Sequence, residues 1–318
     1  MDSFVCPLCQ SNESKILFKT KTIHSGFDIL QCQECGLART FPFPSDDILH
    51  IHNTIQYYGM KENKFIPILQ NVRNLISKIR ARRYLLMIPS SIQRPKVLDI
   101  GCAEGRFLNS FLEYGCECYG VEHPTYPKQR FINSDRIKYI VGELDVLDLR
   151  ERSFNIIILW HVLEHLDNPD VVVSRVYDLL ASDGILVLAV PNFSSIESKI
   201  FKHSWFHLDV PWHKYHFTQK SLKYLMEKKH FEIIQSTTYC FEQGVYGILQ
   251  SILNSMGWPK NELYEAIKGH ILKGRALYLI LQLIISGFLI VPCILIYLIT
   301  SILQKGSVYK MVLKKIDL

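Results

Sequence analysis

Four cysteines near the N-terminus have the residue type and spacing of a metal site. Two C-x-x-C pairs, separated by 22 residues, consist of Cys6 with Cys9 and Cys32 with Cys35. Zinc takes four soft ligands at tetrahedral corners, and each such pair can reach two corners from one turn. Residues 1–15 carry no secretory signal, so we expect a reducing compartment in which such pairs hold metal. The pattern predicts a structural Zn2+ site, with a redox pair as the alternative.

A turn rich in small residues follows an apolar run in the middle of the chain. It reads Asp99-x-Gly101-x-Ala103-x-Gly105, and Glu122 ends the next apolar run. Small residues in such a turn let backbone N–H groups approach a ligand closely. An acid about twenty residues after the turn can accept both hydroxyls of a ribose. The G-x-G-x-x-G pattern of dinucleotide enzymes is absent, so the turn favours a nucleoside ligand with a cationic group near Asp99.

Histidines gather in two stretches that could supply a base. His161 follows an apolar run, and residues 203–217 (HSWFHLDVPWHKYHF) hold four more histidines among aromatic residues. A histidine can take a proton near neutral pH. We expect His213 or His216 to act as the base and His161 to face the substrate, while a packing role is the alternative for each. Asp209 could orient one of them. The segment 161–165 also reads H-x-x-E-H, but it begins where a buried strand should end, so no zinc is expected there.

These residues need a parallel sheet to position them. Short, β-branched apolar runs alternate with helical patterns over residues 95–240, which predicts an α/β fold with a Rossmann-like sheet covered on both faces. A terminal antiparallel pair is expected from 231–236 and 237–241. The other strands are expected at 96–100, 117–121, 138–141, 154–160 and 184–190, and helices near 104–114, 169–181 and 218–229.

Together these motifs resemble the class I S-adenosylmethionine-dependent methyltransferases. Over residues 1–240 the chain is most similar to bacterial members with an N-terminal zinc knuckle, which are often found with glycan or lipid biosynthesis. The matching stretches are 99–105, 120–122, FNIIILWHVLEHLDNP at 154–169, 183–192 and 209–217. The resemblance implies that S-adenosylmethionine (SAM) is the cofactor, with its methionine half near Asp99, its ribose on Glu122 and its adenine near Glu143. The full set of cofactor contacts that it implies is Asp99, Gly101, Ala103, Gly105, Glu122, Glu143, Leu144 and Trp160.

An apolar segment near the C-terminus predicts membrane insertion. Residues 276–303 contain no charged side chain, and basic residues flank both ends. A straight helix of this length exceeds the roughly 30 Å hydrocarbon core of a bilayer. Gly287 and Pro292 interrupt the run, and the basic flanks favour both ends in the cytoplasm. We therefore expect a re-entrant hairpin, with a single tilted span as the alternative. An apolar stripe over residues 248–258 would lie at the membrane interface or pack against the catalytic domain.

Composition supports one full-sized folded domain with attached segments. The chain has 318 residues, 48% of them hydrophobic, and its net charge of +6 is too mild to argue for nucleic acid. The expected parts are a zinc knuckle (1–40), a connector and helix (41–94), the methyltransferase domain (95–242), an amphipathic segment (243–275), the membrane-inserted part (276–303) and a basic tail (304–318).

The expected function is O-methylation of a lipid-linked sugar or another lipid-borne acceptor at the cytoplasmic face of the membrane. A methyltransferase acting on a nucleotide sugar or a small soluble metabolite is the first alternative. A non-catalytic zinc-ribbon scaffold or nucleic-acid binder is the second, and the intact nucleoside motif weighs against it.

Overall fold

The structure is a computed structural model, and it describes residues 4–21, 25–44, 67–142, 149, 151–267 and 276–316. The chain forms two compact units, each built from several segments. The knuckle unit comprises Met1–Lys64, Val190–Tyr224 and Thr237–Lys310, and the sheet unit comprises Phe65–Ala189, Leu225–Ser236 and Met311–Leu318.

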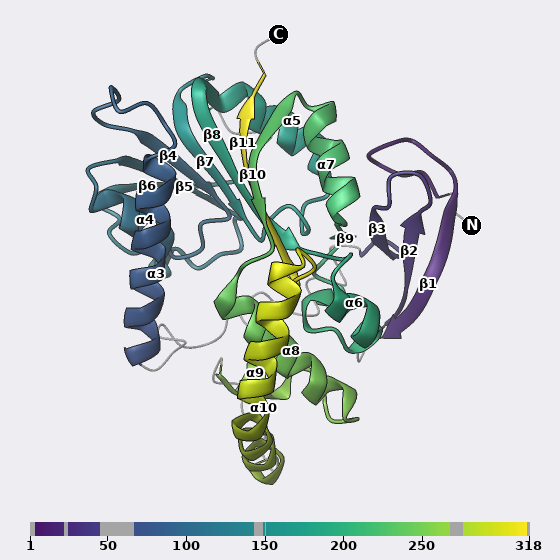
Figure 1. The fold of residues 1–318 in the computed structure, drawn as a ribbon. Helices are drawn as coiled ribbons and strands as arrows, with labels where there is room; N and C mark the ends of the chain where they lie inside the picture. The colour runs from purple at the N-terminus through teal and green to yellow at the C-terminus, as the bar shows by residue number, and fades with distance from the viewer. Residues whose placement is uncertain are drawn as a thin grey trace. The chain divides into compact units, whose positions relative to one another are not determined.

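A seven-stranded sheet forms the centre of the sheet unit, in the order β10-β11-β8-β7-β4-β5-β6 (Figure 1). β4 pairs in parallel with both β5 and β7, which places Asp99 opposite Gly120 and Ile158. The expected Rossmann-like sheet, mostly parallel with a terminal antiparallel strand, is confirmed. The strands are β4 (Lys96–Ile100), β5 (Glu117–Glu122), β6 (Ile137–Val141), β7 (Phe154–Trp160), β8 (Leu180–Pro191), β10 (Phe231–Thr237) and β11 (Val308–Lys315).

The last strand of this sheet comes from a segment that we expected to be a tail. The expected strand at 237–241 is wrong, because Phe241 already begins a helix and β11 lies next to β10 instead. The expected basic tail is wrong as well. Val308, Met311 and Leu313 are almost fully buried. Lys315 Nζ donates a hydrogen bond of 2.7 Å to the Leu180 carbonyl, which satisfies its charge inside the sheet.

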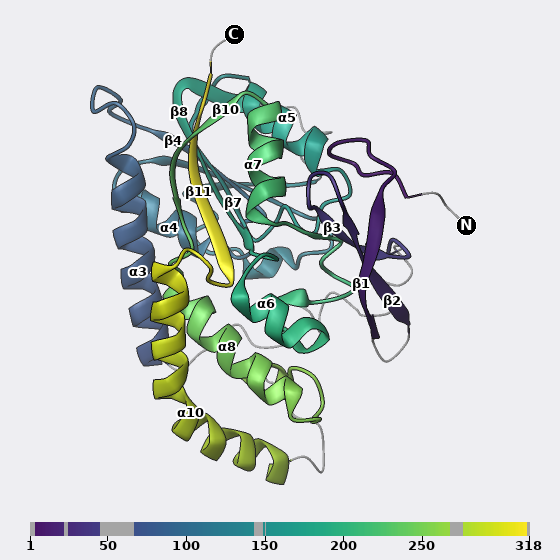
Figure 2. The same cartoon turned by 45° about the vertical axis from the view of Figure 1, so that its right-hand side comes forward.

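Helices cover both faces of the sheet. α3 (Pro67–Leu85) and α4 (Arg106–Leu112) lie on one side, and α5 (Pro169–Leu179) lies on the other (Figures 1 and 2). Pro169 at the start of α5 suits a first-turn position, where its missing N–H is not needed. α7 (Gln219–Lys228) continues from the knuckle unit into the sheet unit. A short 3₁₀ turn, η1 (Lys128–Arg130), follows β5.

A four-stranded sheet in the order β1-β2-β3-β9 organises the first part of the knuckle unit. The strands are β1 (Ser14–Lys21), β2 (Gly26–Cys32), β3 (Ala38–Phe41) and β9 (Tyr215–His216). β3 and β9 pair antiparallel, so that Ala38 lies opposite His216 and Arg39 opposite Tyr215. The cysteine segment and the histidine-rich loop therefore share one sheet, although some 170 residues separate them.

Helices form the rest of the knuckle unit. They are α6 (Ile196–Phe201), η2 (Lys202–Ser204), η3 (Phe206–Leu208), α8 (Phe241–Ser255), α9 (Glu262–Ile267) and α10 (Ala276–Ile302). Ile248, Leu249 and Leu253 of α8 are buried with Cys293 and Tyr297 of α10. The apolar stripe of α8 thus packs against protein.

The apolar segment is one helix. α10 runs without interruption from Ala276 to Ile302 through Gly287 and Pro292, so the favoured hairpin is wrong. Figure 2 shows α10 changing direction along its length, as a proline inside a helix causes. A proline removes one backbone hydrogen bond and bends the helix, but the chain does not reverse. Within the described residues, Leu277–Ile302 is the one helix that is long and apolar enough to cross a membrane.

Candidate functional site

The turn after β4 can be built only with glycine at two positions. Gly101 and Gly105 have φ angles of +71° and +85°, which favour glycine. A Cβ at Gly101 would overlap the side chain of Val162, and one at Gly105 would overlap the hydroxyl of Tyr139. The turn therefore packs bare backbone against Val162 and Tyr139.

Glu122 fixes the same turn from β5. One carboxylate oxygen accepts the N–H of Ala103 at 2.6 Å, and the other accepts the N–H of His123 at 2.9 Å. Ala103 has a φ of +48°, and this short bond helps to hold it in that strained conformation. Each carboxylate oxygen can accept a further hydrogen bond, so Glu122 can hold the turn and still bind hydroxyl groups.

Burial changes the electrostatics of both acids. Asp99 and Glu122 are 4% and 6% exposed. Burial, helped by the nearby Glu122, raises the pKa of Asp99 well above its ordinary value. Burial also raises the pKa of Glu122, although the two backbone N–H groups oppose that shift. A cationic ligand would relieve this cost, which fits the expected charge of the ligand.

Tyr139 is a part of the site that the sequence analysis missed. Its hydroxyl lies 3.0 Å from the Glu104 carbonyl and 2.8 Å from that of Ile132, and so ties β6 to the glycine turn. Phe131 stacks on its ring with centroids 4.0 Å apart. A tyrosine inside a strand pattern gives no signal of this contact. The expected adenine contacts Glu143 and Leu144 lie outside the described residues.

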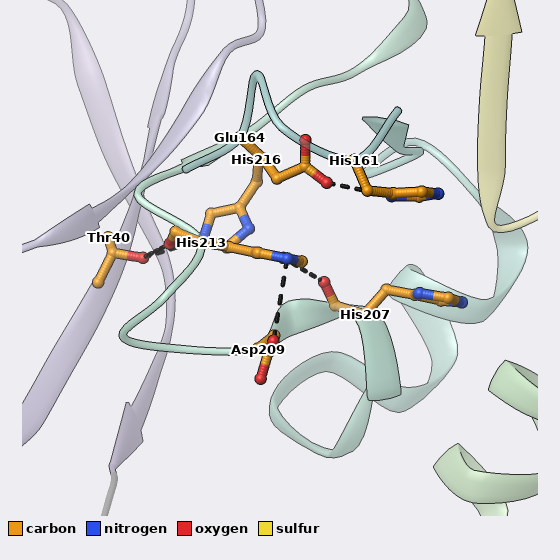
Figure 3. Close-up of polar contacts among 7 residues, drawn as sticks. All are labelled: Thr40, His161, Glu164, His207, Asp209, His213 and His216. Atoms are coloured by element: carbon orange, nitrogen blue, oxygen red, sulfur yellow. Dashed lines mark hydrogen bonds and ion pairs between the residues drawn. The ribbon is translucent and has the colours of Figure 1, made fainter. Parts of the chain in front are cut away.

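Trp160 and His161 end the neighbouring strand β7. The ring of Trp160 packs edge-on against Phe107, and the Arg80 guanidinium lies 4.8 Å from its centroid. His161 has a φ of +54°, and its Nδ1 lies 3.1 Å from the Glu164 carboxylate (Figure 3). Glu164 is 1% exposed, and its hydrogen bond to His161 braces the loop.

In the knuckle unit, hydrogen bonds define which nitrogen of His213 can act as a base. His213 Nδ1 lies 2.8 Å from the His207 carbonyl, and Nε2 lies 4.0 Å from Asp209 Oδ2 (Figure 3). A carbonyl only accepts hydrogen bonds, so Nδ1 carries the proton and Nε2 is the basic nitrogen. Asp209 lies on the Nε2 side of the ring, where a protonated His213 would face its carboxylate.

His216 is held by a threonine from the cysteine segment. Thr40 Oγ1 donates to the His213 carbonyl at 2.8 Å and lies 3.0 Å from His216 Nε2 (Figure 3). Because the Thr40 proton is already used, Nε2 of His216 must be the donor. His216 is 3% exposed and packs on Phe193, so its packing role is the better supported one. Nothing in the sequence connects Thr40 with His216.

The histidine-rich loop rests on α8. Phe206 N–H donates to Ser251 Oγ at 2.9 Å, and Asn254 donates to the Ser204 carbonyl at 3.2 Å. A Cβ at Gly247 of α8 would overlap the His207 ring. The backbone of His207, which orients His213, is therefore packed directly on this helix.

The four cysteines of the N-terminal segment converge. Their sulfur atoms all lie within 4.8 Å of one another, and the Cys6–Cys35 and Cys9–Cys32 sulfurs are each 3.5 Å apart. A disulfide would need about 2.05 Å. Zinc–sulfur bonds of about 2.3 Å place neighbouring sulfurs about 3.8 Å apart at tetrahedral corners. The donor set therefore fits a closed Zn2+ site.

Comparison with known proteins places the sheet unit in context. Residues 70–236 match a protein family described as methyltransferase domain. Two ubiquinone biosynthesis O-methyltransferases of Rhodopseudomonas palustris are each 29% identical, over 102 residues in strain HaA2 and 108 in strain TIE-1. These matches cover 30% and 32% of this chain. The chain spans about two-fifths (40% and 42%) of the length of the curated relatives it matches.

Solved structures share the fold at low identity. Phosphoethanolamine N-methyltransferase 2 of Haemonchus contortus, in complex with S-adenosyl-L-methionine, has a TM-score of 0.54 and 14% identity, over 95% of this chain and 71% of its own. A SAM-dependent methyltransferase of Archaeoglobus fulgidus has a TM-score of 0.47 and 22% identity, over 76% and 94%. The first likeness supports the fold of the chain.

Proposed function

The chain belongs to the methyltransferase domain family, and we propose that it transfers a methyl group from SAM to an oxygen of a lipid-borne acceptor at a membrane surface. The observation that carries the donor assignment is the pair of buried acids, Asp99 and Glu122, beside a turn that only glycine can build. SAM, when bound, supplies a methyl group on a positively charged sulfur. Asp99 would balance that charge, and Glu122 would accept the ribose hydroxyls.

His213 is the base of this proposal. Its Nε2 would take the proton of an acceptor hydroxyl whose oxygen receives the methyl group that SAM would supply. Asp209 then faces a positively charged imidazole. The curated relatives are named O-methyltransferases, which supports oxygen as the accepting atom.

Zinc has a structural part in the proposal. The four cysteine thiolates would fill every corner of the Zn2+ site and leave no open position for chemistry. The strand β3 that follows them pairs with β9 and carries Thr40. Bound zinc would therefore stabilise the sheet that holds His213 and His216.

Membrane association rests on the exposed face of α10. Leu277, Phe288, Val291 and Ile302 are between 61% and 79% exposed. Gln282, Thr300 and Ser301 are buried together with Cys293 and Tyr297, so polar side chains face the protein while large apolar ones are exposed, which reverses the pattern of a helix that faces water. A hydrocarbon environment suits such a surface.

The contacts of α10 favour a helix that lies along the membrane surface over one that spans it. Gln282 donates to Glu262 of α9 at 3.0 Å, and eighteen residues later Thr300 lies 3.4 Å from Glu197 of α6. These contacts are about 27 Å apart along the helix, close to the thickness of a bilayer core. If α10 spanned the membrane, its contact with α9 and its contact with α6 would have to lie on opposite sides of the bilayer. An in-plane helix leaves both contacts on one side, which we take to be the cytoplasmic side.

The acceptor assignment follows from the layers of the knuckle unit. Tyr297 of α10 packs over Gly244 of α8, and Gly247 of α8 packs under His207. A head group held at the membrane beside α10 would therefore arrive one helix away from the loop that holds His213. A lipid-linked sugar or another lipid-borne hydroxyl is the class that this layering suits.

Labelled SAM tests the acceptor class. The full chain is incubated with a native membrane-lipid extract, and separately with the soluble metabolite fraction, and products that gain one methyl group are identified by mass. We expect methylation in the lipid extract. Methylation confined to the soluble fraction would refute the lipid-borne acceptor while leaving the methyltransferase assignment intact.

Cysteine labelling tests the orientation of α10. Lys260 and Lys305 are exposed and lie before and after the helix. Lys260→Cys and Lys305→Cys are treated with a membrane-impermeant maleimide in sealed inside-out vesicles, with the unmodified chain as the background. Both should label without detergent. If one position labels only after the vesicles are opened, α10 spans the membrane.

A further inference from the structure

A second apolar surface lies on the sheet unit. Three residues of α3 (Val72, Leu75 and Ile79) and Leu86, the residue directly after its end, are between 48% and 78% exposed. Their spacing of three, seven and fourteen residues from the first places them on one face of a helix. We refer to them as the α3 stripe.

The opposite face of α3 already has its partner. Ala81 and Tyr84 are buried in the core with Phe111, and Tyr84 packs edge-on against Phe107 of α4. At 100° per residue, these two positions lie about half a turn from the centre of the stripe. Packing in the sheet unit therefore accounts for the inner face of α3 and leaves the stripe unexplained.

Basic side chains flank the stripe. α3 contains Arg73, Lys78, Arg80, Arg82 and Arg83 and no acidic residue. Arg80 lies over Trp160, and Lys78 forms an ion pair of 2.8 Å with Glu113, the acid that faces this side from beyond α4. Arg82 and Arg83 border the stripe on its two sides.

The stripe and its basic border enclose a hollow. Its volume is about 370 Å3, and its lining consists of Leu75, Ile79, Leu86, Lys78, Arg82, Arg83 and Tyr114. Aliphatic and cationic side chains in one lining match the boundary of an anionic lipid layer, where acyl chains meet phosphate groups.

We propose that α3 is a second membrane contact, which inserts its stripe among the acyl chains of an anionic phospholipid surface and places Arg82 and Arg83 on the phosphates. Nucleic acid would pair with the same arginines but would leave four large aliphatic side chains in water. The exposed α3 stripe therefore favours a lipid surface over nucleic acid as the binding partner. This contact is independent of methyl transfer, because it uses neither the acids beside the glycine turn nor the histidines.

Vesicle binding by the full chain tests the proposal. Affinity is measured by co-flotation with neutral phosphatidylcholine vesicles and with vesicles containing one quarter phosphatidylglycerol. A basic residue near an anionic surface contributes about fivefold in affinity, or about 1 kcal/mol. The double variant Arg82→Ala, Arg83→Ala should thus lose about 30-fold on the anionic vesicles alone. Leu75→Ser with Ile79→Ser should weaken binding to both kinds of vesicle.

Two control variants test whether a loss of vesicle binding is specific to the α3 stripe and its arginines. Lys128→Ala with Arg136→Ala removes two exposed charges elsewhere in the sheet unit, and Val171→Ser removes an exposed aliphatic residue of α5. Both should bind vesicles like the unmodified chain. Calorimetric binding of SAM should be unchanged in all four variants, which verifies that each is folded.

Two results would overturn the proposal. The first is a preference for anionic vesicles that persists in the Arg82, Arg83 variant. The second is a dimer, seen by light scattering without lipid, that dissociates in the Leu75, Ile79 variant while vesicle binding stays unchanged. The stripe would then be an interface between two copies of the chain.

Discussion

At the scale of single residues, the acids proposed to bind SAM and the histidine proposed as the base owe their properties to different interactions. Asp99 and Glu122 are tuned by burial, which raises the pKa of both carboxyl groups. His213 is tuned by a hydrogen bond, because the His207 carbonyl holds the proton on Nδ1 and leaves Nε2 basic. The acids were predictable from the turn and strand pattern. The tautomer of His213 was not, because it depends on a backbone carbonyl six residues away.

Replacing His213 should separate proton transfer from cofactor binding. His213→Ala should lower kcat by 10²- to 10⁴-fold, the usual contribution of a general base, and should leave the Kd for SAM unchanged. His203→Ala is the matched control, because His203 is exposed in the same loop, and it should retain full activity. A His213→Ala enzyme within tenfold of the original kcat would remove His213 from the mechanism.

SAM binding should release protons in weakly acidic solution. The free protein holds protons on Asp99 and Glu122 above the ordinary carboxyl range, because burial raises their pKa. A cationic ligand favours the ionised forms and lowers these pKa values, so protons leave on binding, and affinity falls as the pH falls. Calorimetry in buffers of different ionisation enthalpy measures this release. The proton release should vanish at a pH above the raised pKa values of the two acids. Proton uptake on SAM binding in weakly acidic solution would contradict the prediction.

At the scale of elements, the sequence predicted best where local pattern and burial agree. Strands such as β7 and β8 are covered on both faces, so their apolar runs stand out. β11 was missed because α10 separates it from β10 and because its lysines suggest an exposed tail. The Thr40 contact and the pairing of β3 with β9 were missed because nothing local connects segments so far apart in the chain.

Loss of zinc should affect the histidine-rich loop before the sheet unit. Cys32→Ser should abolish binding of one zinc per chain, measured by mass spectrometry of the metal, and should lower methyl transfer because β3 no longer supports β9. SAM binding should persist. Cys116→Ala changes a buried cysteine outside the cluster and should keep its zinc. A zinc-free Cys32→Ser chain with full activity would show that the cluster has no such role.

At the scale of the whole molecule, the chain leaves the sheet at β10, builds α8, α9 and α10, and returns to the same sheet as β11. The apolar helix is thus part of an insertion between two neighbouring strands. Five residues join α10 to β11, and hydrogen bonds to α9 and α6 hold α10 towards its two ends.

The central claim is that the buried acids beside the glycine turn bind SAM. Isothermal titration of the full chain with SAM measures it most directly, with Glu122→Gln and Glu122→Ala compared against Glu113→Ala, which changes an exposed acid of the same unit. We predict saturable binding that weakens about 100-fold in Glu122→Ala, the loss expected for two charge-assisted hydrogen bonds, less in Glu122→Gln and not at all in Glu113→Ala. A folded chain that takes up no SAM at millimolar concentration, or that binds it equally well without Glu122, would contradict the account.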